Sequence, residues 1–179
     1  MGRAGMVHAP DSELRIKTFM SSIRNSGIVR LHGHYTRACQ LLQSPFLLLV
    51  RLYWGWQFAQ DGWGKLRHLP RVTDYFGSLG IPHPGLVAPF VSWVELVGGV
   101  LLVLGLASHI TGLVLAINMF VAYWTGDRDA LHSVLSDPGK FYGADPYTFF
   151  FAALIVFIFG AGLFSVDALI QRRSSVSKA

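Results

Sequence analysis

The chain has 179 residues, of which 52% are hydrophobic and 14% charged, and its formal net charge is +5 at pH 7. A soluble domain carries about 25% charged residues, so this composition indicates a membrane protein with room for one compact domain. The basic residues collect toward both ends of the chain. That distribution is typical of cytoplasmic flanks beside anionic lipid and argues against a nucleic-acid partner.

The chain contains a single cysteine, Cys39, and therefore no CxxC motif. This excludes a thiol–disulfide relay, covalently attached c-type haem and an iron–sulfur cluster held by cysteines.

Residues 1–44 form a polar and basic N-terminal arm that precedes the apolar part of the chain. Scattered apolar residues among its arginines and lysines, over 11–43, fit an amphipathic helix on the inner membrane face. A partly disordered tail, interrupted at Gly27 and Gly33, fits the same residues equally well. Either form is long enough to dock a partner.

Four apolar stretches then follow, and about 20 apolar residues at about 1.5 Å each cross a hydrocarbon layer of about 30 Å. The sequence predicts an all-α fold: a membrane-embedded antiparallel four-helix bundle over 45–170, followed by a basic cytoplasmic tail at 171–179. The stretches run roughly from Pro45 to Ala59, Leu86 to Leu106, Ile110 to Thr125 and Tyr147 to Val166.

The connections between the stretches complete the predicted topology. A short interfacial helix is expected at 71–79, and a polar loop runs from Gly126 to Pro146. The link Ala107–Ser108–His109 is so short that it forces a helix hairpin. Four spans place both termini on one side of the membrane, and the excess of Lys and Arg in the termini favours the cytoplasm of a bacterial-type inner membrane.

Arg51 and Glu95 are charges inside apolar stretches, where a charge is costly unless it is paired or functional. With the termini inside, helical rise puts Arg51 about 10 Å deep, Glu95 about 16 Å and Asn118 about 13 Å. These depths differ by less than the reach of an arginine side chain. We therefore expect the three residues to share one layer between adjacent helices.

Two interpretations of this layer stay open. It is either structural, with the polar groups joining helices, or it binds a polar ligand head such as a quinone carbonyl and passes a proton. In the second case Glu95 carries the proton and Arg51 holds it charged. Glu95 and Arg51 are then the candidate catalytic residues, and Arg51, Glu95 and Asn118 the candidate cofactor-binding residues.

The histidines fall in the arm, in loops or at a turn, and none lies at mid-membrane depth. A b-type haem needs inward-facing ligands from the spans, so no haem is expected. No metal site is predicted, and a metal held by Asp127, Asp129, His132 and Asp137 in the second loop is the remaining alternative.

Three segments of the chain carry a recognisable pattern. The first is the run from Arg51 through Gln57–Phe58 and Gly62 to Lys65–Leu66. The second and most specific is Glu95 followed by Gly98–Gly99, Leu101–Leu102 and Gly105–Leu106, and the third contains Phe159–Gly160–Ala161–Gly162 and Ser165–Val166–Asp167. Together they resemble the DoxX family of membrane proteins over roughly 45–170, and the second segment is similar to the family's E-x-x-G-G-x-x-L-x-x-G-L pattern.

The resemblance implies a four-helix membrane bundle in which Arg51, Lys65, Glu95 and Asp167 are the residues that match. Some members are subunits of thiosulfate:quinone oxidoreductase, and others are linked to membrane oxidoreductase or redox-stress assemblies. The long arm and the extended third loop depart from the compact family pattern and favour a subunit with partners.

We therefore expect a membrane subunit of a quinone-linked oxidoreductase that works on sulfur compounds or in redox stress. Quinone would be its cofactor, near Arg51 and Glu95, and the lipid bilayer and other membrane subunits its partners. The alternative is a non-catalytic structural or assembly subunit of a larger membrane complex. The residues alone do not decide whether the chain is an enzyme.

Overall fold

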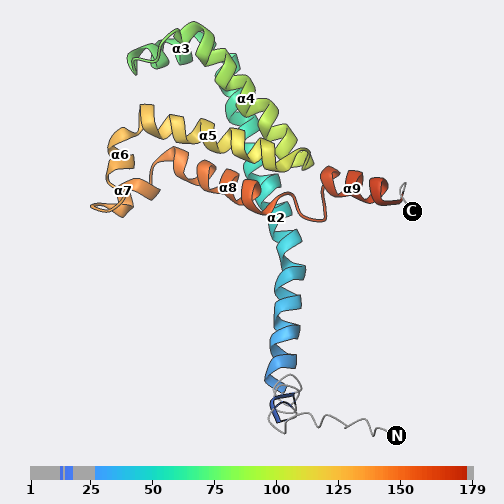
Figure 1. The fold of residues 1–179 in the computed structure, drawn as a ribbon. Coiled ribbons are helices and arrows are strands. Elements are labelled where there is room, and N and C mark those ends of the chain that lie inside the picture. Colours follow the sequence, from blue (N-terminus) through green and yellow to red (C-terminus); the bar gives the residue numbers. More distant parts are fainter. Residues whose placement is uncertain (1–12, 14, 18–26, 177–179) are drawn as a thin grey trace, which may run out of the picture. The chain divides into compact units, whose positions relative to one another are not determined.

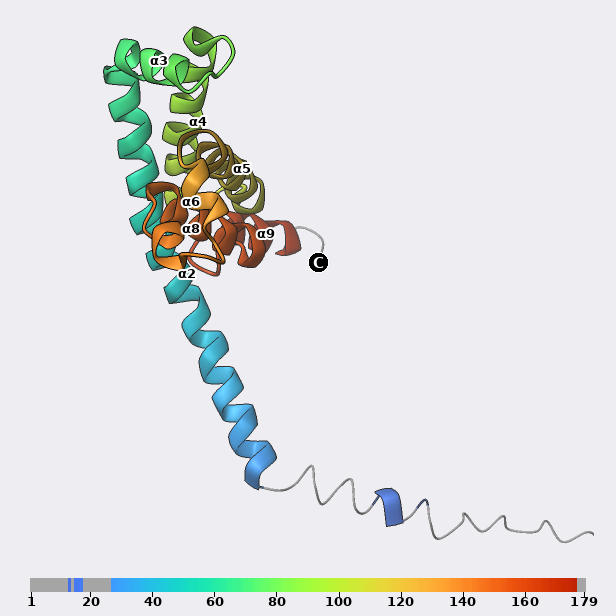
Figure 2. The ribbon, with the colours of Figure 1, turned by 90° about the vertical axis from the view of Figure 1, so that its left-hand side faces the viewer.

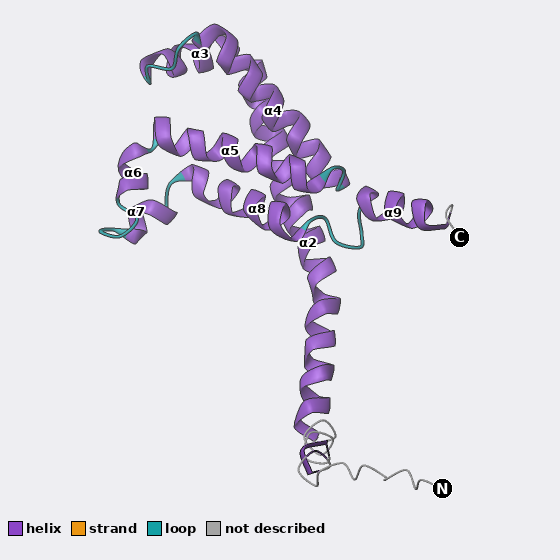
Figure 3. Cartoon of the chain, viewed as in Figure 1, coloured by secondary structure: helices purple, strands orange, loops and turns teal. Residues whose placement is uncertain are grey.

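The protein is described here from a computed structural model, in which residues 13, 15–17 and 27–176 are described. Within these residues the chain forms helices joined by turns and contains no strand (Figure 3), which confirms the predicted all-α class. The chain divides into two units, Met1–Leu42 and Gln43–Ala179. The helices are α2 (Gly27–Arg67), α3 (Leu69–Ser78), α4 (Pro84–Leu104), α5 (Ser108–Gly126), α6 (Arg128–His132), α7 (Pro138–Tyr142), α8 (Asp145–Phe159) and α9 (Val166–Val176).

Helix α2 is longer than the apolar stretch that predicted it. It begins at Gly27, passes through Gly33 and continues through Pro45 to Arg67. A proline removes one backbone hydrogen bond from a helix without having to end it. The part of the expected arm over 27–42 is thus helical, while residues 1–12, 14 and 18–26 lie outside the described residues. The division at residues 44 and 170 stays a prediction.

Helices α4 and α5 form the predicted hairpin; they are in contact beyond their common turn and diverge toward their far ends (Figure 1). Helix α4 ends at Leu104, and Gly105 takes the left-handed conformation, with a φ of 68°, that closes the helix. Its N–H bonds the carbonyls of Leu101 and Leu102, as a C-terminal cap requires. Both helices are long and apolar enough to cross a membrane.

Helix α8 packs along α5 and is shorter than predicted (Figure 1). It ends at Phe159, where Gly160 has a φ of 73°, and its 15 residues span about 22 Å at helical rise. The expectation of a continuous span to Val166 is therefore wrong. The glycines at 160 and 162 both take positive φ, and a separate helix, α9, starts at Val166.

Short helices occupy the two longer connections. Helix α3 covers nearly the same residues as the interfacial helix expected at 71–79. It connects the end of α2 to the start of α4 (Figure 2). The connection after α5, expected as a polar loop, contains α6 and α7. The Tyr123 hydroxyl of α5 donates to the Phe141 carbonyl at 2.7 Å and ties this connection to the spans.

Glycines let the Gln43–Arg67 part of α2 approach α4 closely. A Cβ at Gly62 would lie 2.6 Å from the Ser92 carbonyl oxygen, and one at Gly99 would lie 2.5 Å from the Ala59 nitrogen. Small residues at such contacts are the usual means of packing helices in membranes. Beside this contact lies a core of buried apolar residues: Phe58, Leu102, Leu115, Ala116, Met119, Ala153 and Val156.

The glycine contact predicts that Gly62→Ala destabilises the chain by about 1–3 kcal/mol, because the new methyl group meets α4 backbone that cannot rotate away. Gly64→Ala is the matched control in the same helix, since nothing lies within 4 Å of a Cβ there. The measurement is the free energy of unfolding in mixed micelles. Equal stability of the two variants would contradict the close packing of α2 on α4.

Candidate functional site

Glu95 is a carboxylate midway along α4 with 1% of its side chain exposed. The Lys65 ammonium group of α2 donates to its Oε2 at 2.5 Å, and the Asn118 amide of α5 donates to its Oε1 at 3.0 Å. Both carboxylate oxygens therefore have a partner, and the lysine neutralises the charge. The group joins three helices and meets the rule that a buried charge be paired and hydrogen-bonded.

The local sequence explains why these side chains meet. Gly62 and Lys65 are three residues apart, so they share one face of α2, as Ser92 and Glu95 share one face of α4. The close approach of Gly62 to Ser92 brings the two faces together. Lys65, near the end of α2, has a side chain long enough to reach Glu95 from there.

A cavity of about 530 Å³ opens beside this group. Glu95, Lys65 and Asn118 form a polar part of its wall, and α3, α4 and α5 supply apolar walls. A mostly apolar pocket of 300–1,000 Å³ with a few convergent polar groups is the usual form of a small-molecule site. The apolar walls include Val72, Phe76, Ile81, Val91, Val121 and Trp124.

Arg51 lies in a different place, and the expectation that it shares a layer with Glu95 is wrong. Its side chain is fully buried, and its Nη2 donates to the Phe164 carbonyl at 2.5 Å. A Cβ at Gly105 would overlap the guanidinium, so Arg51 packs against the α4–α5 turn. Its Nε and Nη1 are buried without a hydrogen-bond partner among the described residues.

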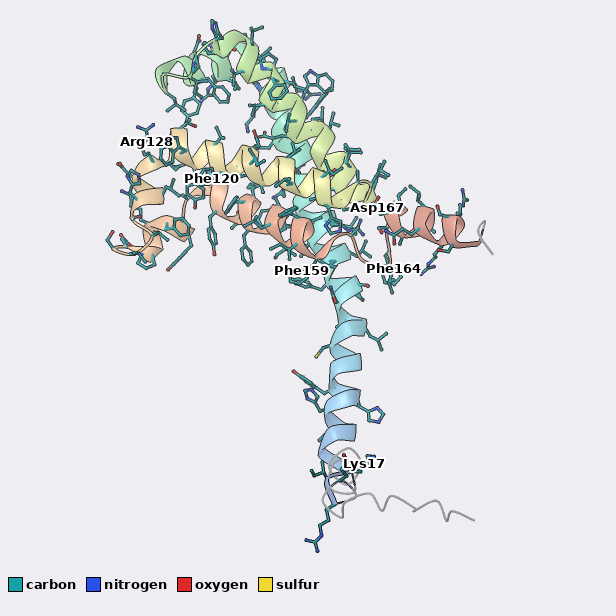
Figure 4. The ribbon with its side chains drawn as sticks, in the orientation of Figure 1. Lys17, Phe120, Arg128, Phe159, Phe164 and Asp167 are labelled. Atoms are coloured by element: carbon teal, nitrogen blue, oxygen red, sulfur yellow. The ribbon has the colours of Figure 1, made fainter. Side chains whose placement is uncertain are left out.

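The two polar groups lie at different levels of α5, since Arg51 packs against the turn before this helix and Glu95 bonds Asn118 near its middle. Figure 4 shows Phe164 and Asp167 near the turn before α5, whereas Arg128, which lines the cavity, lies just beyond the other end of that helix. Depth arithmetic along each helix brought Glu95 and Asn118 together correctly. The same depth estimate wrongly placed Arg51 beside Glu95. The residue of α2 that pairs with Glu95 is Lys65, which lies several turns after Arg51.

Asp167 holds the α4–α5 turn from the start of α9. Its carboxylate accepts the backbone N–H groups of Ala107 at 2.8 Å and Ser108 at 2.9 Å, and its own N–H donates to the Gly105 carbonyl at 3.0 Å. Partial burial raises the pKa of Asp167, but the hydrogen bonds from Ser108 and Ala107 and the nearby His109 lower it further, so the pKa lies below its usual range. Asp167 also attracts the Arg51 guanidinium.

The histidine and acidic side chains do not make a metal centre in the described part of the chain. No three His, Cys, Asp or Glu side chains there approach closely enough to hold an ion, so the alternative of a metal group in the loop after α5 finds no support. His109 bonds the Phe157 carbonyl through Nδ1 at 2.6 Å, which joins α5 to the end of α8.

Comparison with known proteins agrees with the resemblance seen in the sequence. Residues 46–128 match the model of the DoxX family. The chain is 35% identical over 78 residues to a protein of Bacillus subtilis named "Putative oxidoreductase CatD", a match that covers 44% of this chain and 57% of that protein's length. A family match and two apolar helices of spanning length indicate an integral membrane protein.

A second relative covers more of the chain. An uncharacterized protein of Haemophilus influenzae is 27% identical over 135 residues, which is 70% of this chain and 83% of the relative. No solved structure matches the chain significantly.

The pairing predicts how substitutions at these positions combine. Lys65→Met and Glu95→Gln should show a coupling energy of about 1–3 kcal/mol in a double-mutant cycle, because each removes one partner of the same ion pair. Arg51→Met and Glu95→Gln should be additive within about 0.5 kcal/mol, because they act on separate groups. Unfolding in mixed micelles measures both cycles, and coupling of Glu95 to Arg51 instead of Lys65 would overturn the assignment.

The lowered pKa of Asp167 predicts a loss of stability in acid. A group with a depressed folded pKa stabilises the protein fully above its unfolded pKa, about 3.9, and this contribution disappears as the pH falls from there through the folded value. Asp167→Asn should be less stable than wild type at pH 6, and the difference should shrink toward pH 3. Thermal unfolding across this range is the measurement, and a difference that is constant with pH would contradict the assignment.

Proposed function

We propose, from the premise that residues 46–128 form a DoxX domain, that this chain is a membrane subunit of a quinone-linked oxidoreductase and binds quinone in the cavity beside Glu95. The observation that carries the proposal is a buried, hydrogen-bonded carboxylate in the wall of an apolar cavity of about 530 Å³. The name of the Bacillus subtilis relative supports the oxidoreductase class.

The cavity fits the chemistry of a quinone head. Its apolar walls suit a ring and the start of an isoprenoid tail, and its polar wall offers donors for a carbonyl oxygen. When bound, a quinone supplies a two-electron acceptor that takes up two protons, with the electrons coming from a partner protein or a sulfur substrate. The protein's own residues would bind and orient the head and deliver protons.

Each residue of the group has a distinct part in this proposal. Asn118 and Lys65 hold the Glu95 carboxylate in one orientation toward the cavity. Glu95 would carry the proton, since it lines the cavity and can both accept a proton and give one. Lys65 takes the charge-holding role that the sequence assigned to Arg51, and Arg51 stays outside the proposed ligand site because it does not line the cavity.

The membrane arrangement is part of the same proposal. The Gln43–Arg67 part of α2 would form a four-helix bundle with α4, α5 and α8 in a bacterial-type inner membrane. Both termini would lie in the cytoplasm, as the distribution of Lys and Arg favours. Helix α3 would then lie at the outer face, over the mouth of the cavity.

The ligand prediction concerns the volume of the cavity. Val91→Trp places a large ring inside it and should weaken quinone binding by about tenfold or more, which is about 1.4 kcal/mol. Val100→Trp is the matched control, because Val100 is on the same helix, is 46% exposed and does not line the cavity. Quinone extracted from protein purified in native lipid, and titrated back into nanodiscs, gives the stoichiometry and affinity.

Glu95→Gln separates ligand binding from proton transfer in the same assay. A variant that keeps its fold and its quinone but loses quinol formation fits the proposed role of the carboxylate. Wild-type protein that contains no quinone and binds none, yet purifies with other large membrane proteins, would overturn the proposal. That result would favour the alternative of a structural subunit.

A further inference from the structure

We propose that Asp61 is the surface acid through which Glu95 exchanges protons with water, with Lys65 as the intermediate carrier between them. This inference rests on the proposed role of Glu95 as a proton carrier and adds the route by which the proton arrives. It also assigns the route to the membrane face at which α2 ends.

Asp61 contacts Lys65, and Lys65 in turn contacts Glu95. The Lys65 Nζ lies 3.4 Å from the Asp61 Oδ2 and 2.5 Å from the Glu95 Oε2. Asp61 and Lys65 are four residues apart, which puts them on one face of α2. A single ammonium group therefore touches both carboxylates.

Burial changes steadily along this line. The exposed fraction of the side chain falls from 54% at Asp61 to 27% at Lys65 and 1% at Glu95. The outer member is exposed and the inner member is buried, as a transfer route from the surface requires. Asp61 lies six residues before the end of α2, which is about 9 Å at helical rise.

Only the outer end of the route lies outside the proposed ligand cavity. Lys65 and Glu95 line the cavity, but Asp61 does not. A ligand that fills the cavity would displace the water there, and Glu95 would lose any supply of protons through it. The contact of Lys65 with Asp61 would remain, because Asp61 lies outside the cavity.

The acid–base steps balance without any further reactant. The Lys65 ammonium gives one proton to the Glu95 carboxylate, which leaves a neutral amine and a carboxylic acid. A hydronium ion protonates the Asp61 carboxylate, and Asp61 then passes this proton to the Lys65 amine. The sum of these steps moves one proton from the solvent to Glu95 and returns Lys65 and Asp61 to their charged forms.

The test has to consider other polar groups near Glu95 as alternative proton donors. Asn118 of α5 bonds the carboxylate but cannot exchange a proton with it in this way. The titratable or charged residues that share the cavity wall with Glu95 and Lys65 are Tyr75 of α3 and Asp127 and Arg128 beyond α5. Within the described part of the chain, none of these three hydrogen-bonds to Glu95.

The test is time-resolved infrared spectroscopy of the full chain in lipid nanodiscs after laser release of protons from a caged acid. The carboxyl band that disappears in Glu95→Gln belongs to Glu95. Asp61→Asn should slow the rise of this band by about tenfold or more, because it removes a proton donor and leaves the other contacts of Lys65 in place. Asp61→Glu should restore the rate.

Asp74→Asn is the matched control, since Asp74 is an exposed acid on α3, near the same end of α2. It should leave the rate unchanged. A wild-type rate in Asp61→Asn would overturn the route and leave the role of Glu95 intact. Absence of any Glu95 band over the accessible pH range would overturn the proton-carrier role itself, and the route with it.

Discussion

The ion pair between Glu95 and Lys65 is the interaction on which the arrangement of this bundle depends. A carboxylate inside apolar helices is tolerated only with a counter-charge and hydrogen bonds for its oxygens. Glu95 obtains these from two other helices, so its requirements fix the register of α2, α4 and α5 together. Gly62 makes the pairing possible, because a larger residue there would hold α2 away from α4.

Such a pair is an inefficient source of stability, because desolvation of the two charges offsets most of their attraction. A well-packed apolar group would join the helices as firmly. The polar group also lines a cavity, whereas a bundle that served only stability would be packed without a cavity at this place. Both features are easier to explain by a ligand than by stability, and this is the physical reason for preferring a binding role.

Arg51 has a different structural role, which concerns the backbone between α8 and α9. Backbone polar groups in a membrane need partners within the protein, and irregular backbone is tolerated only where it finds them. Helix α8 ends at Phe159, well before α9 starts, and the chain between them is not helical. Arg51 supplies a donor to the Phe164 carbonyl in this segment, and Ser44 accepts the Leu163 N–H at 3.2 Å. On these contacts Arg51 holds irregular backbone in place.

The sequence predicted what depends on composition and on position along a helix. The all-α class, the α4–α5 hairpin and the meeting of Glu95 with Asn118 all follow from apolar length and depth. The partner of Glu95 could not be found in this way, because depth does not give the rotation of a helix or the direction of a long side chain. Lys65 lies near the end of α2, where hydropathy places it outside the span, yet its side chain turns inward.

The early end of α8 escaped prediction for a related reason. The residues after Phe159 are still largely apolar, so hydropathy carries the span on to Val166. The positive φ of Gly160 and Gly162 breaks the helix instead, and composition does not encode that choice. Sequence patterns locate apolar segments well, whereas backbone geometry at single glycines decides where a helix stops.

The separation of the two polar groups has a consequence for the function. If Arg51 had paired with Glu95, the carboxylate would have been joined to groups toward the α4–α5 turn and remote from the exposed end of α2. Pairing with Lys65 connects it to Asp61, which is 54% exposed, within two contacts. The cavity and this chain of contacts share Glu95 and Lys65, whereas Asp61 lies outside the cavity. On the function proposed above, Glu95 would therefore exchange protons through Lys65 and Asp61 while it contacts a bound ligand in the cavity.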